Sequence, residues 1–77
     1  MQENDTVVLN DDVPEYGLQA GDIGTVVFVY EGGAGYEAEF VTPDGQTVAV
    51  VTLKPAQIRP IGPGEIPHAR AVAGGRQ

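Results

Sequence analysis

Two glutamates in an alternating segment are the first side chains that could do chemistry together. Glu37 and Glu39 stand between the apolar residues Tyr36, Ala38 and Phe40. A pair of carboxylates can act as acid and base in glycoside hydrolysis. Alternation also puts both glutamates on one face of a β-strand, where polar residues are expected anyway. We therefore predict a solvent-facing strand surface, which can also serve as a negative stripe for a basic partner.

A second group of carboxylates lies earlier in the chain and comprises Asp11, Asp12, Glu15 and Asp22. Hard divalent cations prefer several carboxylate oxygens. The spacing is not that of an EF-hand loop, however, and no His or Cys stands nearby. Turn formation by Asp side chains is therefore the favoured interpretation. We predict no metal site, and cation binding by the loop at 11–22 remains the alternative.

Two tyrosines are further candidates for a binding role. Tyr16 follows Pro14 in a long loop, and Tyr30 ends the longest apolar run. Tyrosine is a frequent anchor at protein interfaces. The favoured alternative is that Tyr16 and Leu18 fold back and fill one end of a small core. The candidate binding residues predicted from the sequence are Glu15, Tyr16, Tyr30, Glu37 and Glu39.

The residue types that most enzymes need are scarce in this chain. Cys and Ser are both absent, which excludes thiolate and serine nucleophiles. The single His, His68, lies in a Pro- and Gly-rich stretch without a partner at useful spacing. The glycine loop at 31–35 lacks the Lys and the following helix of a phosphate-binding loop. We predict no catalytic residues, no cofactor and a non-enzymatic protein.

Length and charge narrow the possible partners of the chain. Its 77 residues suffice for one domain, and 4 Lys and Arg against 11 Asp and Glu leave a formal net charge of −7. Binding to nucleic acid or to an anionic membrane needs clustered cations, so we expect neither. We also expect neither a signal peptide nor a membrane span, because no apolar run approaches the ~18 residues that a span requires. A cytoplasmic protein is expected.

The charge and the composition both change near Ile61. Residues 1–61 carry ten carboxylates against Lys54 and Arg59, a net charge of −8, whereas residues 62–77 carry a net charge of +1. We predict a domain over 1–61 and a flexible tail rich in Gly, Pro and Ala over 62–77. The two cations of the domain are expected to pair with neighbouring acids.

The pattern within the domain is almost entirely that of β-structure. Short runs of β-branched and aromatic residues predict strands at 6–9, 23–30, 36–40, 47–53 and 58–61, with a helical turn at 54–57. The sequence Thr42-Pro43-Asp44-Gly45 predicts a tight hairpin between the third and fourth strands. Five strands in this arrangement favour an all-β, SH3-like barrel.

Two glycines mark the entry into the longest strand. Gly21 and Gly24 precede Thr25-Val26-Val27, and we expect backbone to pass so close to backbone there that a β-carbon would clash. A Gly-x-x-Gly-x-Val entry of this kind recurs in many SH3-like barrels, ribosomal modules among them.

A longer combination of motifs resembles an uncharacterised family of small, mostly stand-alone bacterial domains. The resemblance spans 5–61 and rests on Val13-Pro14-Glu15-Tyr16-Gly17-Leu18, on Gly21, on Gly24-Thr25-Val26-Val27, on the alternating segment at 36–40, on Asp44-Gly45 and on Leu53. It implies an SH3-like barrel with no established activity. Toxin-like neighbours of some members imply an antitoxin or immunity role.

The sequence thus favours a non-enzymatic, acidic protein-binding module that neutralises a basic protein partner in the manner of an antitoxin or immunity protein. The alternative is an accessory subunit, or an enzyme whose pocket is shared within a symmetric oligomer. An RNA- or ribosome-associated module ranks last, because the domain is strongly negative.

Overall fold

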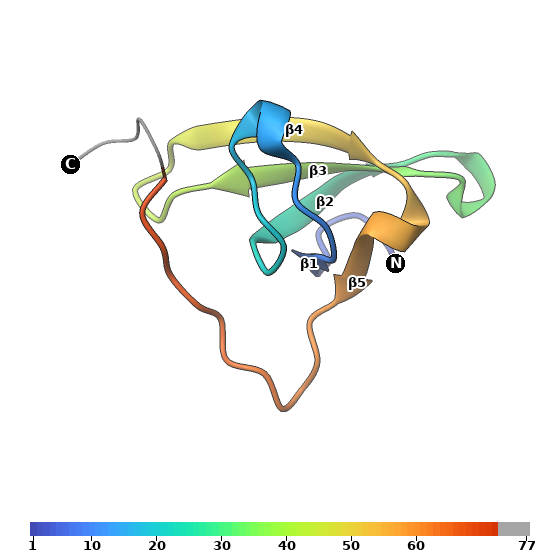
Figure 1. The fold of residues 1–77 in the computed structure, drawn as a ribbon. Helices are drawn as coiled ribbons and strands as arrows, with labels where there is room; N and C mark the ends of the chain where they lie inside the picture. Colours follow the sequence, from blue (N-terminus) through green and yellow to red (C-terminus); the bar gives the residue numbers. More distant parts are fainter. Residues whose placement is uncertain (73–77) are drawn as a thin grey trace.

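All five predicted strands form, and they pair into one antiparallel sheet in the order β4-β3-β2-β1-β5 (Figure 1). The computed structural model describes residues 1–72, so the end of the predicted flexible tail, 73–77, lies outside the described residues. The strands are β1 (Thr6–Leu9), β2 (Ile23–Val29), β3 (Tyr36–Val41), β4 (Thr47–Leu53) and β5 (Ile58–Pro60). Three of the four connections contain a 3-10 turn, namely η1 (Pro14–Tyr16), η2 (Glu31–Gly33) and η3 (Pro55–Gln57), and β3 is followed directly by β4. The all-β prediction is confirmed.

The sheet curls around its core into a small barrel-like fold. β1 lies between β2 and β5, and η3 connects the two outermost strands, β4 and β5. Register shifts interrupt the β2–β3 ladder between Val26 and Phe28 and the β3–β4 ladder between Phe40 and Val41. Irregularities of this kind bend strands and increase their twist, which lets so short a sheet enclose a core.

The core consists of the inward-facing residues of the strands together with two residues of the β1–β2 loop. Tyr36, Ala38 and Phe40 are buried, and Glu37 and Glu39 between them are partly exposed, as the alternation predicts. The buried cluster comprises Val7, Leu9, Val13, Leu18, Val26, Tyr36, Ala38, Phe40, Ala49, Val51, Leu53 and Ile58. Small β-branched side chains therefore supply much of the packing.

The two glycines at the entry to β2 are needed for reasons other than the expected approach of backbone to backbone. Gly21 has a φ of +94° and open space where a β-carbon would be, so its backbone conformation requires glycine. A β-carbon on Gly24 would meet the ring of Phe40, which is a side chain. The expected clash of a β-carbon is thus confirmed at Gly24, where the clash is with a side chain rather than with backbone, and it is wrong at Gly21.

Residues beyond β5 run along the domain without regular secondary structure and reach the β3–β4 hairpin (Figure 1). Arg59 binds Glu65 through two hydrogen bonds of 2.6 Å each, which confirms that this cation pairs with a neighbouring acid. Arg70 binds Asp22 at the start of β2, at 2.6 Å.

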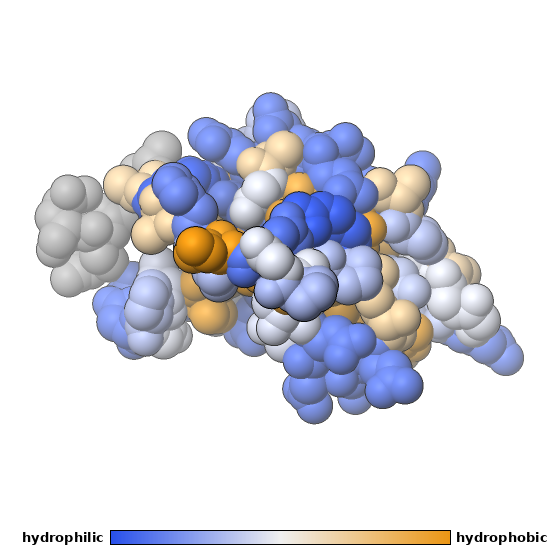
Figure 2. All heavy atoms as spheres, turned by 90° about the horizontal axis from the view of Figure 1, so that it is seen from below, coloured by the Kyte–Doolittle hydropathy of each residue, from blue (hydrophilic) through white to orange (hydrophobic). Residues whose placement is uncertain are grey.

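Seen from below, the surface is mostly hydrophilic, and its apolar residues are scattered (Figure 2). Within 1–72, no helix is long and apolar enough to cross a membrane.

Candidate functional site

The outer face of β2, β3 and β4 carries side chains from three neighbouring strands in register. Phe28 pairs with Glu37, and Glu37 pairs in turn with Thr52 on β4. In the next row, Glu39 pairs with Val50. We call this surface the outer-face patch and define it by Phe28, Tyr30, Glu37, Glu39, Val50 and Thr52.

The centre of the outer-face patch is the carboxylate of Glu37. The Tyr30 hydroxyl donates a hydrogen bond to Glu37 Oε2 at 2.5 Å, and the Thr52 hydroxyl donates to the same oxygen at 2.6 Å. The bonds from Thr52 and Tyr30 lower the pKa of Glu37, and the bond to Glu37 raises the pKa of Tyr30. Two donors thus hold one charged carboxylate in a defined orientation on an exposed sheet face.

Exposed apolar groups surround this carboxylate. The rings of Phe28 and Tyr30 pack edge to face, with centroids 5.0 Å apart and planes at 79°. Phe28 is 46% exposed and Val50 is 49% exposed. Aromatic residues in such contact lose little conformational freedom on binding a partner, which is why they are common at the centres of interfaces.

Phe28 is a patch residue that sequence reasoning missed. In a regular strand, Val26 and Phe28 would share a face, because side chains alternate. The ladder shifts between them, so Val26 pairs with inward-facing Ala38, whereas Phe28 pairs with outward-facing Glu37. Val26 is fully buried as a result, and Phe28 is exposed. The run of apolar residues at 23–30 contains no signal for this shift.

Three of the five predicted binding residues come together on the outer-face patch. Tyr30 and Glu37 are in direct contact. Glu39 lies two residues along β3 on the same face and accepts a hydrogen bond of 3.0 Å from the Thr47 hydroxyl. The two glutamates are therefore engaged by different partners along one strand face, as the alternation predicts.

The other two predicted residues, Glu15 and Tyr16, lie in η1. The residues that flank this turn, Val13 and Leu18, pack in the core, so η1 sits at the core side of the sheet rather than on its outer face. Leu18 fills the core as the alternative interpretation proposed, but Tyr16 is 49% exposed and does not.

The acidic loop between β1 and β2 forms turns, as its composition predicts. The amide of Ala20 donates to Asp12 Oδ1 at 2.8 Å, and the amide of Gln19 donates to Asp22 Oδ2 at 2.8 Å. In the part of the chain that the structure describes, no group of three or more His, Cys, Asp and Glu is placed to hold a metal ion.

Comparison with known proteins yields a family for most of the chain. A family model described as "Domain of unknown function (DUF4926)" matches residues 3–60, from the segment before β1 to the end of β5. No curated protein and no solved structure matches the chain.

Proposed function

The chain belongs to the DUF4926 family of domains, and from this premise we propose that it is a non-enzymatic protein-binding module. It docks a basic protein partner on the outer-face patch. The observation that carries this proposal is the Glu37 carboxylate, which Tyr30 and Thr52 hold in place among exposed apolar side chains.

The chemistry of the patch suits an arginine or lysine on the partner. The Tyr30 and Thr52 hydroxyls use one oxygen of Glu37, so its other oxygen is available to accept a hydrogen bond. The neighbouring rings of Phe28 and Tyr30 offer apolar contact and a cation–π interaction to the same cation. A group that is already oriented loses less entropy on binding, which favours affinity.

The negative charge of the domain adds a long-range attraction to the binding of a basic partner. Residues 1–61 carry a net charge of −8, and a field of one sign speeds and orients encounter with a partner of the opposite sign. Neutralisation of a basic cleft by an antitoxin-like or immunity-like protein is the specific form of this function that we propose.

The fold that presents the patch is, we propose, an SH3-like barrel. Its support is the strand order β4-β3-β2-β1-β5, with a single 3-10 turn between β4 and β5. A long loop between β1 and β2, which here contains η1, completes the layout expected for such a barrel.

The test measures binding to the proteins encoded beside this chain in the genome. Calorimetry compares the natural chain with the double variant Glu37→Lys/Glu39→Lys and with the matched control Glu3→Lys/Asp11→Lys, which changes net charge equally. We expect the patch variant to weaken binding by about tenfold or more and to reduce its salt dependence, because it removes docking contacts as well as charge. The control variant should lose about threefold or less.

Two outcomes contradict the proposal. If both double variants weaken binding equally, net charge rather than the outer-face patch recognises the partner. If no neighbouring protein binds, the neutralising role is wrong. Light scattering on the same samples tests the alternative function, that of an accessory subunit or an enzyme in a symmetric oligomer. A pocket shared between subunits requires an oligomer.

A further inference from the structure

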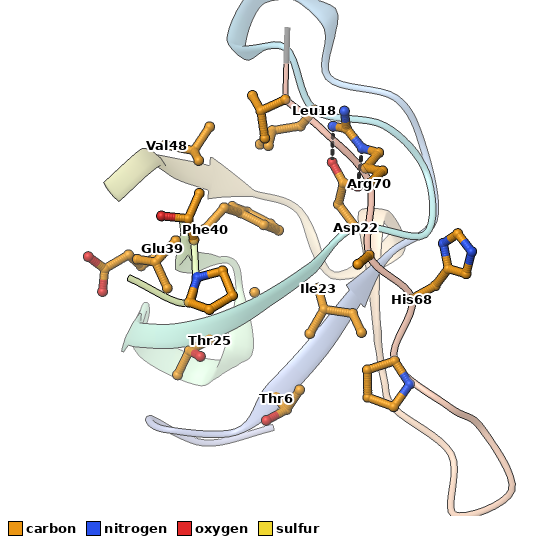
Figure 3. A pocket seen from close by; sticks show the side chains of 17 residues that line it. Thr6, Leu18, Asp22, Ile23, Thr25, Glu39, Phe40, Val48, His68 and Arg70 are labelled. Atoms are coloured by element: carbon orange, nitrogen blue, oxygen red, sulfur yellow. Dashed lines mark hydrogen bonds and ion pairs between the residues drawn. The ribbon is translucent and has the colours of Figure 1, made fainter. Parts of the chain in front are cut away.

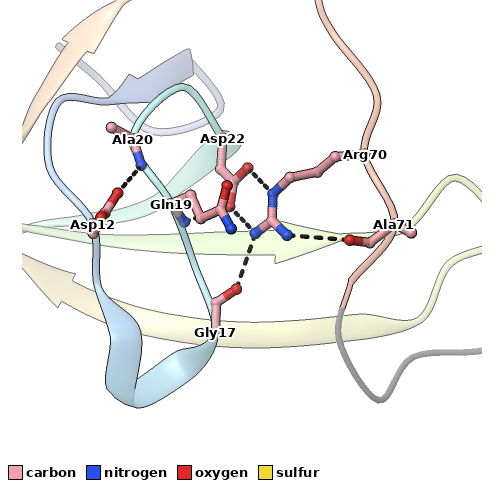
Figure 4. Close-up of polar contacts among 7 residues, drawn as sticks. All are labelled: Asp12, Gly17, Gln19, Ala20, Asp22, Arg70 and Ala71. Carbon is pink, nitrogen blue, oxygen red and sulfur yellow. Dashed lines mark hydrogen bonds and ion pairs between the residues drawn. The ribbon is translucent and has the colours of Figure 1, made fainter.

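The start of β2 holds a guanidinium group in a site made of three hydrogen-bond acceptors. Arg70 Nε donates to Asp22 Oδ1 at 2.7 Å, and Arg70 Nη2 donates to Asp22 Oδ2 at 2.6 Å. The same Nη2 donates to the carbonyl oxygen of Gly17 at 2.9 Å (Figure 4). We call Asp22 together with the Gly17 carbonyl the guanidinium receptor. The bidentate contact that this receptor makes suits the planar guanidinium of arginine and not the ammonium group of lysine.

The loop that forms the guanidinium receptor is held in shape by bonds that do not involve Arg70. The Gln19 amide donates to Asp22 Oδ2, which orients the carboxylate. Val13 and Leu18 exchange two backbone hydrogen bonds of 2.9 and 3.1 Å, and Gly17 between them has a φ of +70°. The receptor should therefore persist when Arg70 leaves it.

Burial makes a cation important at this position. The side chain of Asp22 is only 15% exposed, and that of Arg70 is 26% exposed. Burial, the largest influence, raises the pKa of Asp22, but the hydrogen bonds from Arg70 and from the Gln19 amide lower it more. Arg70 itself covers part of this carboxylate, so without Arg70 both oxygens of Asp22 are open to another guanidinium.

An apolar pocket of about 460 Å³ adjoins the guanidinium receptor (Figure 3). It lies between the start of β2, the end of β3 and the segment 67–72. Its apolar lining includes Leu18, Ile23, Phe40 and Val48 from the domain. An extended peptide with an arginine would find both an acceptor for its cation and apolar side chains to contact.

The guanidinium receptor lies within the part of the chain that the family model matches, whereas Arg70, which occupies the receptor, lies outside it. Gly17 and Asp22 lie within residues 3–60, which the family model matches, and Arg70 lies outside them. We propose that the guanidinium receptor is a binding site for an arginine in an extended segment of a partner protein. Arg70 is its intramolecular occupant. This site is separate from the outer-face patch and goes beyond the function proposed above.

Competition with Arg70 sets the affinity of this site for a partner. A tethered group has an effective concentration of roughly millimolar, so the natural chain should bind an external arginine peptide weakly. The variant Arg70→Ala removes the competitor and leaves the receptor residues intact. Its affinity for the peptide should therefore exceed that of the natural chain.

The probe is a blocked peptide with the sequence of residues 66–72, Ile-Pro-His-Ala-Arg-Ala-Val, labelled for fluorescence anisotropy. We expect it to bind full-length Arg70→Ala about tenfold more tightly than the natural chain. Binding should shift the amide NMR signals of Gln19 and Ala20. The same peptide with Lys for Arg should bind the variant about tenfold more weakly, because Lys cannot form the two-pronged contact.

Two further variants distinguish peptide binding at the guanidinium receptor from a general effect of net charge. Arg70→Ala/Asp22→Asn keeps an acceptor for the Gln19 amide but loses the carboxylate, and it should bind the peptide about tenfold more weakly than Arg70→Ala. Arg70→Ala/Asp11→Asn removes the same charge elsewhere and should bind like Arg70→Ala. Phe28→Ala should leave peptide binding unchanged, so a failure of the outer-face patch is distinguishable from a failure of this site.

Several results would overturn the proposal. One is equal peptide affinity of the natural chain and a folded Arg70→Ala variant. Another is an equal loss of peptide affinity in Arg70→Ala/Asp22→Asn and Arg70→Ala/Asp11→Asn. A third is equal binding of the Arg peptide and the Lys peptide to Arg70→Ala. If Arg70→Ala does not fold, Arg70→Lys replaces it, because it keeps the charge and loses the two-pronged contact; unimproved binding by that variant also contradicts the proposal.

Discussion

The ring of Phe40 occupies the space that a side chain at Gly24 would need: a β-carbon there would lie 2.7 Å from the ring. Phe40 is 3% exposed and belongs to the core cluster, so the ring has little room to move. Gly24 therefore allows β2 to pass over a buried aromatic ring of the core.

Gly24→Ala should destabilise the domain by about 1–3 kcal/mol, because it forces a buried ring off its packed position. Urea denaturation monitored by circular dichroism measures the change. Gly64→Ala is the matched control, since a β-carbon there meets nothing within 4 Å, and it should change stability by less than about 0.5 kcal/mol. If Phe40→Leu does not reduce the effect of Gly24→Ala in the double variant, the clash with the ring is not the cause.

Val50 and Val51 offer a test of which side of β4 faces the core. Val51 is 4% exposed and Val50 is 49% exposed. Val51→Ala removes two buried carbon atoms and should cost about 2 kcal/mol, including the cavity left behind. Val50→Ala should lie within about 0.5 kcal/mol of the natural chain. Equal losses in thermal or urea denaturation would contradict the assigned faces.

The ion pair between Arg59 and Glu65 should be visible in the acid titration of the protein. The bonds from Arg59 and from the Gly62 amide lower the pKa of Glu65 from 4.5 to about 2. A lowered folded-state pKa means that the pairing stabilises fully above the ordinary pKa and is lost as the pH falls through about 2. Carboxyl ¹³C NMR should place the midpoint there.

The variant Arg59→Gln isolates the cause of this shift. It should raise the Glu65 midpoint toward 4.5, although the Gly62 amide still holds the midpoint somewhat below that value. An unchanged midpoint would show that Arg59 does not hold Glu65 in solution.

The contact between Tyr30 and Glu37 predicts opposite shifts in the two groups. The Tyr30 pKa is raised, chiefly by its bond to Glu37, so Glu37→Gln should lower it toward its ordinary value. The Glu37 pKa is lowered, first by Thr52 and then by Tyr30, so Thr52→Val and Tyr30→Phe should each raise it. NMR titration of the tyrosine ring and the glutamate carboxyl signals measures both.

The directions of the Glu37 and Tyr30 pKa shifts determine how the stability of the domain depends on pH. The bonds to ionised Glu37 contribute above the ordinary pKa of a glutamate and disappear as the pH falls through the lowered value. The Tyr30 bond persists as the pH rises until the raised pKa of Tyr30 is passed. A Tyr30 pKa that does not respond to Glu37→Gln would mean that the outer-face patch lacks its central contact.

Much of the fold follows from local patterns. The β-branched runs predicted the strands to within one residue at each end. The alternation at 36–40 predicted which side chains of β3 are buried, and Thr42–Gly45 predicted a turn that closes with a bond from Gly45 N–H to the Thr42 carbonyl. These features depend on neighbours in the chain, so composition and spacing were sufficient to determine them.

The sites depend on contacts that no local pattern contains. Phe28 faces outward because of a shift in the β2–β3 ladder, which arises from the partner strand. Asp22 and Arg70 meet across 48 residues, although a tail with little periodicity gave no sign of it. Tyr30 reaches Glu37 only because β2 and β3 are paired. The sequence alone therefore determined an acidic all-β domain and the two faces of β3. Tertiary structure decided the outward face of Phe28 and which side chains meet, because bonds between distant residues form only once the sheet has brought them together.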